Sequence, residues 1–167
     1  MDAYQQAANL FSNDNKTSNA NQCLLKIATL ASGAGAYGKA AEIFETIGKE
    51  SLSSNLGKYA AKGHFTQCVL CLLAQGDSVA AQSKLEEFKQ ADFSFPSARE
   101  CDFLEKLIAA FDGNNGEDFS QACADFDRIT PLDPWKTTVL LKAKKFIDAA
   151  AGEDGGGGDD DDDVDIS

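Results

Sequence analysis

One histidine and two cysteines form the first group in this chain whose residue types could do chemistry. His64, Cys68 and Cys71 are spaced i, i+4 and i+7, which places them on one face of a helix. A structural zinc site needs four ligands, and no fourth candidate lies nearby. A redox pair of the Cys-x-x-Cys type needs a helix start in a βαβ unit, whereas this pair falls in mid-helix. We therefore expect these residues to pack in the core, with no metal and no cofactor.

The sequence also lacks the residues that a phosphate-binding loop or a catalytic triad would need. The glycine run at 155–158 has no expected strand before it and no Lys-Ser or Lys-Thr after it, so it is typical of a linker rather than a phosphate-binding loop. A chain with a single histidine and no nucleophile elbow offers no catalytic triad. We expect no catalytic residue, and we expect that the protein is not an enzyme.

A set of cations on successive expected hairpins indicates binding rather than catalysis. The set comprises Lys26, Lys58, Lys62 and Arg99. If the hairpins stack, these side chains could line one side at intervals of about 10 Å, the usual spacing of packed helices. The alternative is a scatter of solvated lysines, and the spacing alone does not decide between the two.

The C-terminus is the second candidate for binding. An acidic run at 159–163 is followed by Val164, Asp165, Ile166 and Ser167. Acidic tails usually only increase solubility. The isolated aliphatic side chain at the penultimate position, Ile166, could instead insert into a pocket of a partner.

A repeat of about 40 residues must position these groups. The pairs Ala40/Phe44, Ala81/Leu85 and Ala122/Phe126 are each 41 residues from the next, and Tyr4 precedes Phe44 by 40. A small residue followed four positions later by a large apolar one lets a neighbouring helix approach while the large side chain fills the gap. A fixed period of this length is typical of stacked helical hairpins. We therefore predict an all-α fold of antiparallel, TPR-like helical hairpins.

Periodicity and capping residues give the expected boundaries of the helices. Helices are predicted at 2–12, 18–32, 36–49, 54–75, 78–91, 97–112, 117–129 and 134–150. Asp77 or Ser78 should cap the fifth, and Ser97 with Glu100 should form a capping box on the sixth. Asp133 followed by Pro134 should begin the last.

Composition and charge set the class of protein. The formal charge of −12 is concentrated at the end of the chain, since residues 153–167 hold eight acids and no base. We expect a helical domain at 1–151, ending in a helical bundle, and a disordered Gly/Asp tail at 152–167. The acidic total argues against a nucleic-acid partner. No run of 18 apolar residues and no secretory signal is visible, so we expect a soluble, cytoplasmic protein.

Five ordered blocks of this sequence resemble the C-terminal half of the alpha-type soluble NSF attachment proteins. The blocks are NQCLLKIA, KAAEIFETIG, LGKYAAKGHF, SAREC and LDPWKTTVLLKAKK. The resemblance covers residues 2 to 150 and implies a twisted sheet of helical hairpins that ends in a helical bundle. It also implies an adaptor that binds the SNARE four-helix bundle and presents it to the ATPase NSF, and that meets the membrane only peripherally, through SNAREs.

The resemblance also implies roles for particular residues. The SNARE-facing surface would contain Lys26, Leu56, Tyr59, Lys62 and Arg99. Asp112 matches an acidic position that contacts NSF, and Ile166 takes the penultimate place of a leucine that stimulates NSF. Ala109 and Gly113 replace neighbouring acids of the NSF patch, and Gln22 replaces a SNARE-binding lysine.

Missing segments leave other interpretations open. By this resemblance we expect the chain to begin inside a repeat and to lack the family's first hairpins and their membrane-contacting loop. We therefore expect weaker and more salt-sensitive SNARE binding than in a full-length member. A generic helical-repeat scaffold for other partners and a truncated fragment, non-functional or dominant-negative, are the alternatives.

Overall fold

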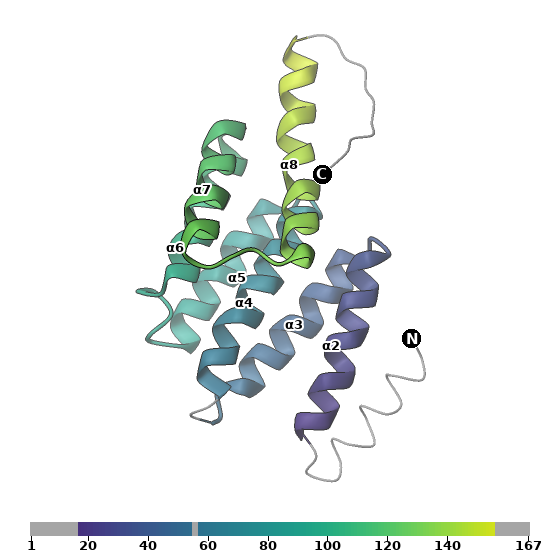
Figure 1. Cartoon of the computed structure of the whole chain (residues 1–167), viewed down its shortest axis with the longest axis vertical. Helices are drawn as coiled ribbons and strands as arrows, with labels where there is room; N and C mark the ends of the chain where they lie inside the picture. The colour runs from purple at the N-terminus through teal and green to yellow at the C-terminus, as the bar shows by residue number, and fades with distance from the viewer. Residues whose placement is uncertain (1–16, 55–56, 156–167) are drawn as a thin grey trace.

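The computed structural model describes residues 17–54 and 57–155, and this part of the chain is all-α (Figure 1). Its helices are α2 (Thr17–Gly33), α3 (Tyr37–Ser51), α4 (Gly57–Ala74), α5 (Ser78–Ala91), α6 (Arg99–Asp112), α7 (Gly116–Ile129) and α8 (Pro134–Gly155). Three antiparallel hairpins, α2/α3, α4/α5 and α6/α7, are followed by the long helix α8. The predicted fold class is confirmed.

The 41-residue repeat is the core of the hairpins. Each of its pairs lies on the second helix of a hairpin, α3, α5 or α7, and all six side chains are buried. The alanines allow close approach of the neighbouring helix, and the larger residues fill the space beside them. The expected helix at 2–12 lies outside the described residues.

Helix α4 is the centre of the packing. It contacts α3, α5, α6 and α8, so beyond its exposed first turn it is largely surrounded by protein. Its sequence fits this position, because buried side chains such as Ala61, Phe65 and Leu70 do not fall on one stripe but occur around the helix. A helix that is apolar on all sides is stable only in the interior of a fold.

Turn and cap residues set the boundaries of the hairpins largely as expected. Gly35 and Gly76 have φ of 86° and 87°, a backbone conformation that favours glycine in the tight turns after α2 and α4. The Asp77 carboxylate accepts a hydrogen bond from the backbone N of Ala80 at 2.9 Å. Asp133 likewise accepts one from the backbone N of Lys136 at 2.7 Å, so both predicted aspartate caps are confirmed.

Three predicted boundaries differ from the structure. Helix α4 begins at Gly57, three residues after the expected start at 54. Helix α6 begins at Arg99, and Ala98 occupies its N-cap position. No capping box forms, because the Ser97 hydroxyl donates to the carbonyl of Ser94 instead. Helix α8 continues to Gly155, past the expected end near residue 150. The first four residues of the tail predicted to be disordered at 152–167 therefore belong to α8, and residues 156–167 lie outside the described part of the chain.

The start of helix α8 contacts the first described hairpin, α2/α3. The indole Nε1 of Trp135 donates to the hydroxyl of Ser32 in α2 at 2.9 Å, and the Trp135 ring meets Phe44 of α3 edge-on, with centroids 5.5 Å apart. The contact joins residues that are 103 positions apart in the sequence. Among the described helices, none has both the length and the apolar character needed to cross a membrane.

Candidate functional site

The histidine–cysteine group lies on α4, where it belongs to the packing of the core. Cys68 and Cys71 are buried, and burial raises the pKa of the Cys71 thiol to about 12. His64 is half-buried, and its Nδ1 lies 3.0 Å from the Oε1 of Gln67. A protonated, buried thiol is a poor nucleophile and a poor metal ligand, so we assign these side chains a packing role.

Lys62 of α4, predicted to face a partner, forms an internal ion pair. Its Nζ lies 3.2 Å from the Oδ2 of Asp92 and donates to the hydroxyl of Ser94 at 2.7 Å. Both acceptors belong to the loop that joins α5 to α6, which projects at the left of Figure 1. Asp92 is only 7% exposed. The ammonium group therefore holds this loop against α4.

Burial and hydrogen bonding act in opposite directions on Asp92. Burial alone would raise the pKa of its carboxyl group, but the hydrogen bonds from Ser94 and the contact with Lys62 outweigh it, and the net pKa is lowered. The carboxylate Oδ1 accepts from both the backbone N and the hydroxyl of Ser94, at 3.0 and 2.8 Å. Asp92 is therefore charged at neutral pH and supports the turn that follows α5.

Arg99, at the first position of α6, also has internal partners. Its guanidinium donates to the hydroxyl of Thr130 and, at 3.3 Å, to the carbonyl of Phe126. The same group lies over the Phe126 ring, 4.7 Å from the centroid. Arg99 thus closes the C-terminal end of α7 while remaining exposed on its outer side.

Three further predicted or candidate contacts are more accessible. Tyr59 is 84% exposed in the first turn of α4, and Lys58 beside it is exposed and forms no ion pair within the described residues. Lys26 is exposed in the middle of α2, whose sequence contains no other charged residue. Leu56 lies outside the described residues.

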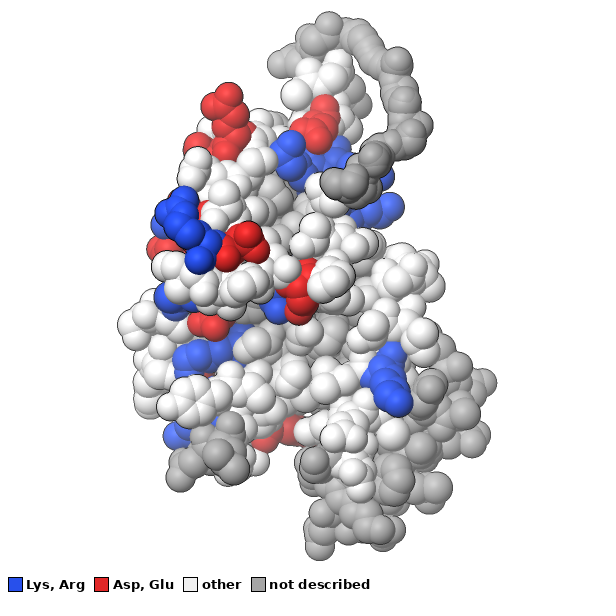
Figure 2. All heavy atoms as spheres, in the orientation of Figure 1, with Lys and Arg blue, Asp and Glu red and all other residues white. Residues whose placement is uncertain are grey.

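The cations do not form one continuous row on the face seen in Figure 2. Positive atoms lie along the left side of this view with acidic atoms between them, and an isolated positive group lies over α2. The structure brings Tyr59, Lys62 and Arg99 to the same end of the hairpins, because Lys62 contacts the loop that leads into α6. Lys26 belongs to a separate hairpin.

Acidic side chains gather at the opposite end of the hairpins. The hydroxyl of Ser78 donates to Asp112 at 2.5 Å, which joins the start of α5 to the end of α6. Asp77 caps α5 nearby, and Glu117 and Asp118 occupy the exposed first turn of α7. Asp112 is therefore part of an acidic end. Ile166, the other residue predicted to act on NSF, lies outside the described residues.

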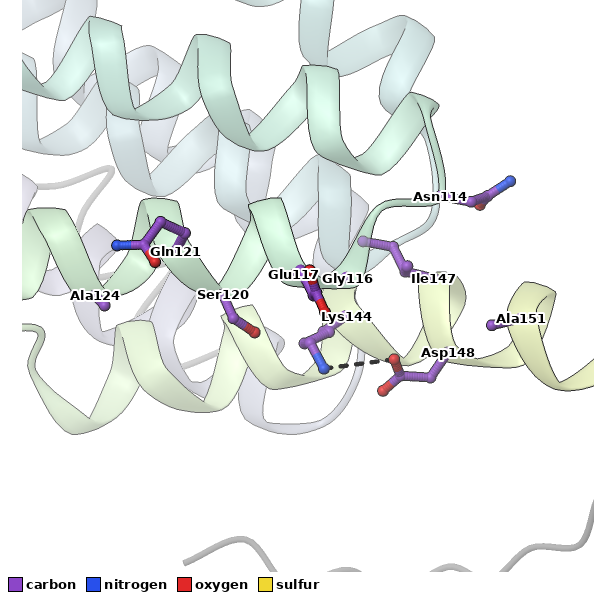
Figure 3. A pocket seen from close by; sticks show the side chains of 10 residues that line it. All are labelled: Asn114, Gly116, Glu117, Ser120, Gln121, Ala124, Lys144, Ile147, Asp148 and Ala151. Carbon is purple, nitrogen blue, oxygen red and sulfur yellow. Dashed lines mark hydrogen bonds and ion pairs between the residues drawn. The ribbon is translucent and has the colours of Figure 1, made fainter.

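A groove of about 700 Å³ separates α7 from α8 (Figure 3). Small or polar residues such as Gly116, Ser120 and Ala151 line it. The charged groups on its α8 wall neutralise each other, since Lys144 lies 3.5 Å from Asp148. This lining provides shape but no activated base or nucleophile.

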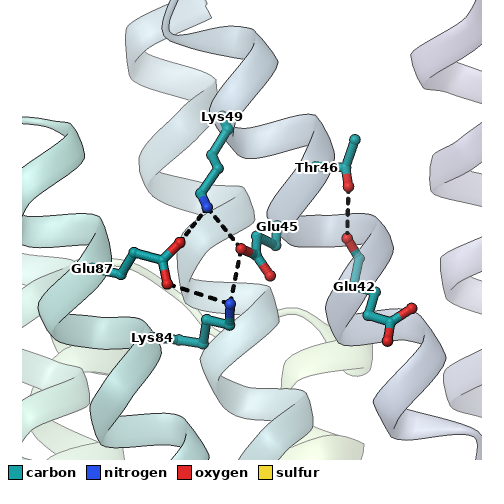
Figure 4. Close-up of polar contacts among 6 residues, drawn as sticks. All are labelled: Glu42, Glu45, Thr46, Lys49, Lys84 and Glu87. Atoms are coloured by element: carbon teal, nitrogen blue, oxygen red, sulfur yellow. Dashed lines mark hydrogen bonds and ion pairs between the residues drawn. The ribbon is translucent and has the colours of Figure 1, made fainter.

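An ion-pair network that the sequence did not reveal connects α3 with α5 (Figure 4). Lys49 bridges Glu45 and Glu87, and Lys84 bridges the same two carboxylates at 2.9 and 3.3 Å. The hydrogen bond from Lys49 lowers the pKa of Glu87 despite the opposing effect of burial. Only the two local spacings, i,i+4 for Glu45 and Lys49 and i,i+3 for Lys84 and Glu87, were visible in the sequence, and the contacts between the helices were not. We call these four side chains the α3–α5 network.

Sequence reasoning also missed Phe93, the most exposed large apolar side chain among the described residues, at 95%. It lies in the α5–α6 loop between Asp92 and Ser94, the two residues that bind Lys62. The short alternation of acid, Phe, Ser and Phe before Pro96 was the available signal. It did not show which of Phe93 and Phe95 would be buried.

Comparison with known proteins relates this chain to one family. Residues 1–148 match the family described as soluble NSF attachment protein, SNAP. Over 146 residues the chain is 41% identical to the alpha-soluble NSF attachment protein of Dictyostelium discoideum, covering 87% of this chain and 50% of that protein. Over 144 residues it is 40% identical to the beta-soluble NSF attachment protein of Bos taurus, covering 86% of this chain and 48% of that protein.

A fungal relative extends the comparison. The chain is 35% identical over 150 residues to a probable vesicular-fusion protein sec17 homolog of Schizosaccharomyces pombe, covering 90% of this chain and 52% of the relative. The chain therefore spans about half the length of the curated relatives that it matches.

Proposed function

The chain belongs to the soluble NSF attachment protein family, and we propose that it is a non-enzymatic adaptor that binds SNARE complexes and recruits the ATPase NSF to take them apart. Family membership supports the adaptor role. We place the protein in the cytoplasm, with membrane contact only through SNAREs. The two partners, both proteins, would contact different ends of the helical hairpins.

The single observation that carries this proposal is the polarity of α6. Arg99 is its first residue and Asp112 its last, so the helix holds a predicted SNARE contact and a predicted NSF contact about 20 Å apart, at a rise of about 1.5 Å per residue. Packing of α6 against α4, α5 and α7 keeps this distance fixed. A rigid spacer between two binding ends is what an adaptor requires.

The SNARE-binding end comprises the start of α4 and the α5–α6 loop. Tyr59 supplies exposed aromatic surface there, beside Lys58, which is exposed as well. Leu56 and Lys26 are included on sequence grounds, with Lys26 as an outlying contact on α2. An aromatic side chain near cations suits an acidic helical partner, because contact area and charge attraction act together.

The NSF-binding end comprises the acidic turns at the other end of the hairpins. Asp77, Asp112, Glu117 and Asp118 present negative charge that would attract a basic partner. Ile166 is proposed to stimulate ATP hydrolysis by inserting an aliphatic side chain into NSF.

Binding to an assembled SNARE complex at low salt tests the first half of the proposal. We expect Lys26→Glu to weaken binding several-fold, because it reverses an exposed charge, and we expect raised salt to have a similar effect. Lys39→Glu is the matched control, since Lys39 is an exposed lysine on α3. No binding by the unchanged chain, or equal losses in both variants, contradicts the proposal.

NSF turnover on a preformed complex of SNAREs and this chain tests the second half. Ile166→Ala should remove most of the stimulation of ATP hydrolysis and leave SNARE binding unchanged. Asp112→Asn should weaken NSF recruitment by a small factor, because a single exposed charge contributes at most about 1 kcal/mol. If Ile166→Ala is as active as the unchanged chain, the tail has no stimulating role.

A further inference from the structure

The α5–α6 loop holds one large apolar side chain in solvent while fixing its neighbours on both sides. Asp92 is buried and binds Lys62 and Ser94, and Phe95 is fully buried, with its ring edge-on to Phe65 at 5.6 Å. Between these two anchors Phe93 is 95% exposed. Its exposure therefore follows from a fixed backbone on either side of it.

Backbone hydrogen bonds make the loop compact. The N–H of Phe95 donates to the carbonyl of Asp92 and that of Ala98 to the carbonyl of Phe95, both at 2.9 Å. The side chain of Asp92 accepts twice from Ser94 within the same turn. A side chain held in this way loses little conformational entropy on binding, which favours affinity.

The loop adjoins the proposed SNARE-binding end. Lys62 contacts both neighbours of Phe93 and is one helical turn from Tyr59, so Tyr59 and Phe93 flank the same ion pair. Folding gains nothing from two aromatic side chains in water at one end of a helix pair. Exposed aromatic residues in a cluster with cations are typical of protein-binding sites.

We propose that Phe93 is a further specificity-determining contact for the SNARE complex, in which its ring binds an apolar strip between the acidic helices of that complex. In this proposal Lys62 is a positioning residue, which holds the loop that presents Phe93. This inference rests on the proposed function. The cation that the partner meets here is Lys58, because the ammonium of Lys62 is already bound to Asp92 and Ser94.

Replacement of the aromatic ring tests the anchor. Phe93→Ala should weaken binding to an assembled SNARE complex at low salt at least 10-fold and leave the midpoint of urea unfolding unchanged, because the ring makes little contact with the fold. Val79→Ala, which removes an apolar side chain that is 80% exposed at the opposite end, is the matched control and should bind normally.

A pair of variants separates positioning from direct contact. Lys62→Met leaves the Asp92 carboxylate without its cation, and we expect weaker binding and faster amide hydrogen exchange in residues 92–98. In the double variant Lys62→Met/Asp92→Asn the amide oxygen still accepts from Ser94 and no buried charge remains. Binding and exchange protection should then recover, with a salt dependence like that of the unchanged chain.

The binding results distinguish a failure of the Phe93 anchor, of the Lys62 positioning role and of the proposed function. If the unchanged chain binds and Phe93→Ala binds equally well, the anchor is wrong while the proposed function stands. If the double variant binds as weakly as Lys62→Met, Lys62 contacts the partner directly and its positioning role is wrong. If the unchanged chain does not bind at all, the proposed function fails and this inference fails with it.

Discussion

Two regions of this molecule use lysine–carboxylate pairs in different surroundings. In the α3–α5 network both lysines and Glu87 are between 32% and 41% exposed, and Glu45 is 18% exposed (Figure 4). In the contact between α4 and the α5–α6 loop, Asp92 is 7% exposed and Lys62 is 19% exposed, above three stacked or edge-on phenylalanines. The first region connects two helices that each pack against α4, whereas the second fixes a loop.

The difference shows that burial, rather than the number of ion pairs, decides what such a pair contributes. Water and salt screen the charges of the α3–α5 network, so each pair contributes at most about 1 kcal/mol. A buried carboxylate that loses its partner retains the cost of its desolvation. Four lysine–carboxylate contacts in the network should therefore matter less than one at the loop.

The largest expected effect comes from the aromatic residues beneath the loop. Phe65→Ala should lower the free energy of unfolding by about 3–5 kcal/mol, because Phe65 is fully buried and stacks on Phe88 with ring centroids 4.1 Å apart. Urea unfolding monitored by circular dichroism measures the change. A loss below 1 kcal/mol would show that the loop is not supported by this packing.

Removal of the cation should have the next largest effect. Lys62→Met should cost about 1–3 kcal/mol, because Asp92 stays buried while one of its partners is lost. The matched change in the network, Lys84→Met, removes two ion pairs and should cost less than about 1 kcal/mol. Equal losses in the two variants would remove the distinction between the two regions.

The pH dependence of stability separates the regions further. The pKa of Asp92 is lower in the folded state, so its contribution is complete above its unfolded value of about 3.9 and is lost as the pH falls through the folded value. Between about pH 5 and pH 2, the free energy of unfolding should therefore fall more steeply for the unchanged chain than for Asp92→Asn. Parallel curves would mean that this carboxyl group is not linked to folding.

Salt gives the smallest effect and the sharpest contrast. Raising the ionic strength should reduce the destabilisation caused by Lys84→Met almost to zero, because exposed charges are screened within about 10 Å at 0.1 M salt. The destabilisation caused by Lys62→Met should persist. Thermal unfolding of both variants at low and high salt measures the two responses.

Local sequence signals predicted what depends on local structure. The 41-residue repeat identified the buried pairs on α3, α5 and α7, and the two aspartate caps began α5 and α8 as expected. These predictions succeeded because helical periodicity and capping act over a few residues. The site depended instead on contacts between residues about 30 positions apart, which no short pattern contains.

Three particular features illustrate the limit. Ser97 and Glu100 fit a capping box, but the Ser97 hydroxyl donates to the carbonyl of Ser94, and α6 begins two residues later than expected. A Cβ at Gly48 would lie 2.7 Å from the Phe65 ring, so glycine at this position permits a close approach of α3 and α4 that no local pattern indicated. The partner contacts predicted for Lys62 and Arg99 stay predictions, but no local pattern showed their internal partners, which lie in the α5–α6 loop and at the end of α7.

The contact between Trp135 and Ser32 connects the last described helix to the first, so the hairpins are not arranged as an open row. In an open row of repeats the two ends fray independently. Here the first hairpin cannot detach without releasing the start of the last helix, so local opening at either terminus becomes a single cooperative event. A force applied to α2 would accordingly be transmitted directly to α8.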